Sequence, residues 1–287
     1  PSTGSSDGDR VNNRNSRFTP SLRLTYEVND DWFLEANYRR YSSRVNYNQL
    51  VPSSVYKDSL SYEMGNSEVQ PSFTHSASVD VTWKDWNLSA SYTHTTDEIT
   101  SAWVNLDNQT NVATYMPFNF STMKEWSLYL SYNKSIKKLF LYASANVSFP
   151  HSRYPFLGEE RTANKVSWGG NLNLNYTLNK QWTFYTTFSY DSRSEYGITF
   201  IHSRNRWDLG VRARFLKNRL TANLVATDIL HGANYNRLMD YFMNMADGTN
   251  GKSDFRGIKL TLAYTIFNKR INVRAKQGNS EELMRTQ

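Results

Sequence analysis

The sequence predicts an all-β fold, an antiparallel transmembrane β-barrel. Three observations indicate it. Apolar and polar residues alternate with a period of two in about eleven segments, short and long connections alternate between these segments, and Trp and Tyr concentrate at segment ends. A strand with this alternation can place one face against lipid and the other against a wet lumen.

The composition agrees with such a wall. Of the 287 residues 39% are hydrophobic and 15% aromatic, and the mean hydropathy is −0.67. Alternating faces give a polar average even where one face is apolar throughout. The sequence has no apolar run long enough for a transmembrane helix. It has no cysteine, which excludes disulfides and thiolate metal ligands.

Each expected strand carries apolar residues at every second position. In the first strand Leu22, Leu24 and Tyr26 share one face, and Arg23 and Thr25 lie on the other. The remaining segments repeat this alternation. The eleven expected strands are 21–28, 32–39, 76–83, 86–93, 126–132, 139–147, 168–178, 182–190, 207–215, 220–227 and 258–266.

The connections distinguish the two ends of the barrel. Short turns are expected at 29–31, 84–85, 134–138, 179–180 and 217–219, and long polar loops at 45–70, 97–122, 150–164, 192–203 and 231–255. Tight periplasmic turns and longer external loops are typical of outer-membrane barrels. Trp32 and Trp182 flank short turns, and Trp126 and Trp168 lie near long loops, as expected of two aromatic girdles.

Other classes explain the sequence less well. A soluble β-sandwich, such as a lectin-like one, also alternates, but it has no reason to place every long loop at one end. The net charge of +7 comes mostly from scattered Lys and Arg, so we expect no nucleic-acid partner. The histidines lack metal-ligand spacing, and no phosphate loop or nucleophile elbow is present. We therefore expect no enzyme, no cofactor and no metal.

The sharpest local feature is a charged group on the inward face of the ninth strand, Arg206, Asp208, Arg212 and Arg214. This group could bind an anionic ligand or a plug domain. It could also be a solvated ladder of charges around Asp208, which is the interpretation we favour.

A second candidate is the aromatic and Met-rich part of the last long loop. Tyr235, Tyr241 and Phe242 could contact a ligand, a lipoprotein lid or another partner outside the cell. Packing against neighbouring loops explains the same residues equally well, so both alternatives stay open.

Three stretches carry a family resemblance. They are Gly-Asn-Ser-Glu-Val-Gln-Pro at 65–71, Asp-Ile-Leu at 228–230, and the end of the chain, with 257–267 followed by Lys269-Arg270 and Glu281-Glu282-Leu283. Together they resemble the C-terminal part of the TonB-dependent receptor-like outer-membrane β-barrels of Bacteroidota. Ser67, Val69 and Ser72 depart from the family pattern in the first stretch.

The resemblance implies a barrel in the bacterial outer membrane that takes up a bulky nutrient, such as a glycan, a peptide or a metal chelate. The partners it implies are outer-membrane lipid, N-terminal barrel strands with a plug domain, TonB and a surface lipoprotein. The alternative is a non-transporting barrel that scaffolds surface lipoproteins or an envelope assembly.

Strand parity predicts that these strands are about half of a barrel of about 22 strands. The last strand runs inward to a periplasmic tail at 268–287, so the first of eleven strands also runs inward. Residues 1–17 would then end an extracellular loop, and 18–267 would form the barrel. Unpaired sheet edges are costly in lipid, so the remaining strands are expected from upstream sequence or from another chain.

Overall fold

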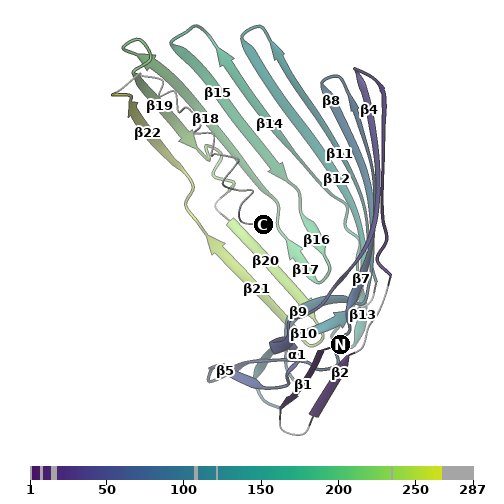
Figure 1. The fold of residues 1–287 in the computed structure, drawn as a ribbon. Coiled ribbons are helices and arrows are strands. Elements are labelled where there is room, and N and C mark those ends of the chain that lie inside the picture. The colour runs from purple at the N-terminus through teal and green to yellow at the C-terminus, as the bar shows by residue number, and fades with distance from the viewer. Residues whose placement is uncertain are drawn as a thin grey trace, which may run out of the picture.

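The computed structural model describes residues 2–6, 9–13, 18–106, 109–120, 122–233 and 235–266. Its main feature is a curved antiparallel sheet in which eleven barrel strands neighbour one another in chain order (Figure 1). These strands are β3 Ser21–Asn29, β4 Trp32–Ser43, β7 Ser72–Trp83, β8 Trp86–Thr96, β11 Met123–Ile136, β12 Leu139–Phe156, β14 Ser167–Thr177, β15 Trp182–Asp191, β18 Arg204–Phe215, β19 Leu220–Thr227 and β22 Gly257–Tyr264. The predicted antiparallel fold and strand number are confirmed.

Short turns join the strands at the upper end of the sheet in Figure 1. In the β3–β4 turn the side-chain oxygen of Asn29 accepts hydrogen bonds from the backbone N–H groups of Asp31 and Trp32, at 2.9 and 3.1 Å. Asn179 accepts two equivalent bonds in the β14–β15 turn. Asn favours turns because its side chain can satisfy these N–H groups. The turn before β12 is shorter than predicted, because β11 continues to Ile136.

The two faces of the wall have the predicted polarity. Along β11, Trp126, Leu128 and Leu130 lie on one face and are 59%, 44% and 40% exposed. Ser127 and Tyr129 lie on the opposite face and make side-chain hydrogen bonds to β12. An apolar face that remains uncovered is suited to lipid, and a hydrogen-bonded polar face is suited to an aqueous lumen.

The sheet has two open edges among the described residues. β3 and β22 pair on one side only, and they do not pair with each other. The edge side chains Leu24 and Ile258 are therefore 60% and 79% exposed. This arrangement agrees with the prediction that the strands form part of a larger barrel.

The long connections differ from the prediction, which expected them to be loops. Most of them fold into strands, which together with the helix α1 Tyr47–Leu50 we call the loop layer, in the lower part of Figure 1. One four-stranded sheet contains β5 Ser54–Asp58, β6 Ser61–Met64, β9 Glu98–Val104 and β10 Ala113–Phe120, and the other contains β16 Ser194–Tyr196, β17 Thr199–Ile201, β20 Tyr235–Phe242 and β21 Met245–Lys252. In addition, β12 runs past the predicted end of its strand and pairs with β13 Glu159–Ala163.

The buried apolar cluster of the described residues lies in this loop layer. Its members are Ala102, Val104, Met116, Phe120, Tyr154, Ala163, Ile198 and Phe242. The barrel wall has lipid on one side and lumen on the other, so it needs no such core. The external strands lack both supports, and each large apolar side chain buried among them contributes about 1.5–3 kcal/mol.

Two smaller elements complete the described chain. β1 Ser2–Ser6 and β2 Asp9–Asn13 form a hairpin separate from the barrel sheet, where the sequence analysis expected the end of a loop. The helix α1 Tyr47–Leu50 starts with a capping box formed by Asn46 and Gln49. No helix in the described ranges has the length and apolar character needed to cross a membrane. The predicted tail at 268–287 lies outside the described residues.

Candidate functional site in the lumen wall and loop layer

The charged group predicted on β18 divides into two pairs along the lumen face. Near the loop layer, the guanidinium of Arg206 donates from Nε to both carboxylate oxygens of Asp208, each at 3.0 Å. Asp208 also accepts the backbone N–H of Asp228 at 2.9 Å. Arg206 is therefore neutralised by a carboxylate that is itself fixed by the backbone, as the charge-ladder interpretation expects.

Arg212 and Arg214 lie nearer the turn end of β18, and both are exposed. No ion pair joins either side chain to a carboxylate among the described residues. The Arg212 guanidinium lies 5.9 Å from the ring centre of Tyr185. These two side chains are the part of the predicted patch that retains uncompensated positive charge. Whether they bind a ligand stays a prediction.

Tyr185 is held over the backbone of β18 by a glycine. A Cβ atom on Gly210 would lie 2.1 Å from the Tyr185 ring, so only glycine accommodates this ring position. The phenol donates to the side-chain oxygen of Asn223 at 2.9 Å. The aromatic surface beside Arg212 is therefore rigid, a feature that the strand pattern gave no means of predicting.

Asp228 has a structural role that sequence reasoning did not assign. It is fully buried, has a left-handed φ of 49°, and accepts the backbone N–H groups of Gly232 and Ala233 at 3.0 and 3.2 Å. Asp tolerates this conformation better than most residues and satisfies nearby N–H groups. The family-like Asp-Ile-Leu segment thus ends β19 and shapes the connection toward β20.

The Gly65–Pro71 segment is fixed by a similar set of contacts before β7. A Cβ on Gly65 would lie 2.1 Å from the carbonyl oxygen of Val51. Asn66 donates to a backbone carbonyl of β10 at 3.0 Å, and Gln70 and Asn119 exchange two hydrogen bonds at 2.7 and 2.9 Å. The motif therefore fastens the loop layer to the barrel wall.

The predicted loop contacts have different surroundings. Phe242 is 2% exposed and its ring centre lies 5.1 Å from that of Phe118, which favours packing between loops over ligand contact. Tyr241 is partly exposed, and the guanidinium of Arg161 lies 5.3 Å from its ring centre. The side chain of Tyr235 lies outside the described residues.

Tyr241 also lines a hollow of about 400 Å³ between the β12–β13 hairpin and the sheet containing β17 and β20. Other lining residues are Tyr154, Arg161, Glu195 and Phe200. Aromatic faces together with one cation and one carboxylate suit an amphipathic polar ligand. This hollow is the candidate ligand site that contains a predicted loop contact, and sequence reasoning found only Tyr241 of it.

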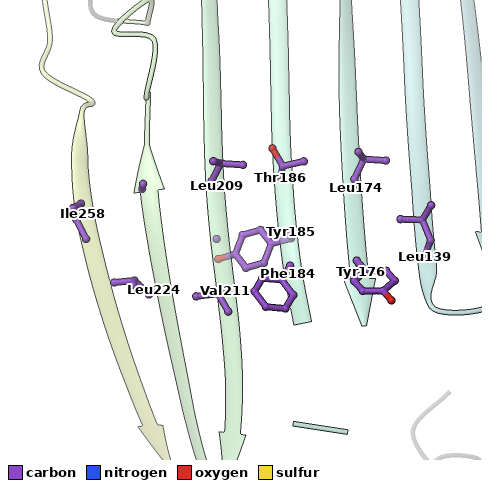
Figure 2. A pocket seen from close by; sticks show the side chains of 12 residues that line it. Leu139, Leu174, Tyr176, Phe184, Tyr185, Thr186, Leu209, Val211, Leu224 and Ile258 are labelled. Carbon is purple, nitrogen blue, oxygen red and sulfur yellow. The ribbon is translucent and has the colours of Figure 1, made fainter. Parts of the chain in front are cut away.

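A second hollow, of about 610 Å³, lies on the apolar face of the wall and is shown in Figure 2. Leu174, Phe184, Leu209, Leu224 and Ile258 line it from five strands. It offers few polar groups for recognition, so we assign it to contact with lipid chains rather than with a substrate.

The described residues contain no group of His, Cys, Asp or Glu that could hold a metal ion. At the base of the loop layer, burial raises the pKa of the Glu98 carboxyl.

Comparison with solved structures shows a shared fold. The siderophore receptor PirA from Pseudomonas aeruginosa has a TM-score of 0.55 and 12% identity, over 74% of this chain and 39% of that chain. A mutant of the ferric enterobactin receptor PfeA from the same species, in complex with enterobactin, has 0.57 and 15%, over 86% and 40%. The outer membrane transporter YddB from Escherichia coli has 0.55 and 12%, over 88% and 41%. The chain thus spans about two fifths of the length of each.

A search of the curated proteins finds no match. A family model described as the outer membrane protein beta-barrel family matches residues 2–264, which is nearly the whole chain. An antiparallel wall with an apolar outer face is what an outer-membrane barrel requires. The chain therefore belongs to the outer membrane protein beta-barrel family and is located in the outer membrane.

Proposed function

We propose that the chain forms part of the barrel and the external loops of a TonB-dependent receptor-like transporter for a bulky nutrient. The nutrient would be a glycan, a peptide or a metal chelate. The observation that carries the proposal is the lumen wall, whose polar side chains are hydrogen-bonded to one another. The loop layer lies at the external end of this wall and contains a ligand-sized hollow. The fold shared with siderophore receptors supports it.

The open edges support a wide barrel. Each unsatisfied backbone group in a bilayer costs several kcal/mol, so β3 and β22 require partner strands in the membrane. We propose that further barrel strands supply them, from the same polypeptide or another one, and that a plug domain fills the lumen. Arg212 and Arg214, which have no carboxylate partner in the described part of the chain, face the space where a plug would lie.

Uptake by cells tests the proposal. Bacteria with and without the gene would be supplied with ferric enterobactin, an oligosaccharide or an oligopeptide as the limiting nutrient. We expect uptake of one probe to require the protein and to stop when TonB is deleted or the proton gradient is dissipated. Uptake that is independent of the protein for all three probes, with stable copurification of surface lipoproteins, would instead support the scaffold alternative.

The hollow provides a sharper version of this test. Arg161→Ala and Tyr241→Ala remove a cation and an aromatic face from it, and should lower uptake of the accepted probe while leaving the amount of folded protein unchanged. Lys57→Ala is the matched control, because Lys57 is an exposed loop-layer cation on the other small sheet. Equal uptake by all three variants would place the ligand elsewhere.

A further inference from the structure

A row of five basic side chains crosses the barrel wall at its loop end. The strand registers pair Arg40 with His75, His75 with His94, His94 with Lys124, and Lys124 with His151. We call these five residues the basic row. Each one follows the alternation of its strand, so all five lie on the same outward face as the apolar residues below them.

The basic row lies directly above an aromatic row. The next outward-facing positions toward the membrane are Tyr38, Ala77, Tyr92, Trp126 and Phe149, which are paired in the same way. Trp126 and Phe149 are 59% and 43% exposed. Aromatic girdles mark the membrane–water boundary, and residues two positions apart on a strand are about 6.6 Å apart. The basic row is therefore at the level of the lipid headgroups of the outer leaflet.

Several donors of the row are available to a ligand. Lys124 and His151 are exposed. The guanidinium of Arg40 donates to the carbonyl oxygen of Phe18 at 3.2 Å, and its buried Nε has no hydrogen-bond partner among the described residues. Nη2 is the remaining guanidinium nitrogen that can donate to an anion.

Tyr38 forms a hydrogen bond with one histidine of the row. Its phenol oxygen lies 2.8 Å from Nδ1 of His75. When the phenol donates to Nδ1, the imidazole proton is carried by Nε2, which is then free to donate to an acceptor in the headgroup layer.

Carboxylates do not compensate the row within the described residues. None of the ion pairs found there includes a member of it. Glu160, on the neighbouring hairpin, pairs with Arg153 at 3.5 Å. Glu125, which follows Lys124, lies on the opposite face and accepts a hydrogen bond from Ser148. The outward face at this level thus has a net positive charge.

We propose that the basic row binds the phosphate groups of the anionic glycolipid that forms the outer leaflet. Neighbouring strands are about 4.8 Å apart, so the row presents donors over about 19 Å of wall. That width suits a headgroup with more than one phosphate, whose acyl chains then pass over the aromatic row. Arg and Lys bind phosphate, no group of His, Cys, Asp or Glu in the described residues could hold a metal ion, and the location beside lipid argues against a soluble anion.

The test measures lipid binding and is independent of transport. The full-length protein, purified in mild detergent and stripped of lipid, would be titrated with diphosphorylated lipid A and with its dephosphorylated form, and bound lipid counted by native mass spectrometry. We expect Lys124→Gln to weaken binding of the phosphorylated form about fivefold, and Lys124→Gln with His151→Gln to weaken it further. Lys124→Arg should bind as the unchanged protein does.

Lys180→Gln is the matched control, because Lys180 is an exposed lysine in a turn at the opposite membrane boundary. Heat-modifiable migration in gels would establish that each variant is folded, and binding by the unchanged protein should weaken with added salt. The proposal is overturned if Lys124→Gln and Lys180→Gln bind equally well, or if the dephosphorylated lipid binds as tightly as the phosphorylated one.

Discussion

Replacing Leu174 by arginine tests which face of the wall meets lipid. Leu174 lies in the C-terminal half of β14, where the register pairs it with Leu141 and Thr186, and it lines the hollow on the apolar face (Figure 2). An arginine near the bilayer midplane costs about 2–4 kcal/mol, which is a factor of about 30 to 1,000 in the folding equilibrium.

Asn173→Arg is the matched control on the adjacent position. Asn173 faces the lumen and accepts one hydrogen bond, from Asn175 at 3.0 Å. Losing this bond costs about 1 kcal/mol, and the new guanidinium stays in water. The expected difference between the two variants is therefore at least about 1–3 kcal/mol, with Leu174→Arg the less stable.

The assay compares both variants in the outer membrane and in refolding. The fraction of protein that is heat-modifiable reports assembly, and urea titration in lipid bilayers gives the free energy of unfolding. Leu174→Arg should be depleted from the membrane, and Asn173→Arg should assemble normally. Equal stability of the two variants, or the reverse order, would refute the face assignment.

Four further variants test the loop layer. Phe242→Ala should destabilise it by about 3–5 kcal/mol through the cavity it leaves, seen as faster proteolysis of the external loops. Asp228→Ala removes the acceptor of two part-buried backbone N–H groups, at about 1 kcal/mol each, which should be seen as faster hydrogen exchange around that connection. Gly65→Ala forces its Cβ against the carbonyl oxygen of Val51 and should expose the preceding loop to protease. Burial raises the pKa of the Glu98 carboxyl. The contribution of Glu98 to stability is therefore fully present below the pKa of the unfolded state and is lost as pH rises through the pKa of the folded state. Glu98→Gln should flatten the pH dependence of loop proteolysis.

Each of these results has a control in the barrel itself. Heat modifiability should persist in all four variants, because the wall does not depend on the loop core. Protection of the loops equal to that of the unchanged protein would contradict the packing argument for Phe242, Asp228 or Gly65. A steeper pH dependence in Glu98→Gln would contradict the sign derived for that carboxyl.

The sequence alone determined the wall. A period of two is a local property of the chain. Every strand has lipid on one face and water on the other, so the polarity of a residue such as Leu128 or Ser127 predicts which face it occupies. The tight turns follow from the same local chemistry, as Asn29 illustrates. Neither feature depends on contacts between distant parts of the chain.

The tertiary structure decided the arrangement of the long connections. Their apolar residues are few and belong to segments far apart in sequence, such as Val104, Tyr154 and Phe242, so no single segment shows a buried face. The division of the predicted β18 group at Gly210 also depends on a contact between strands, because the ring of Tyr185 from β15 covers the backbone there. The basic row also depends on the register between five strands, because each strand contributes only one of its residues.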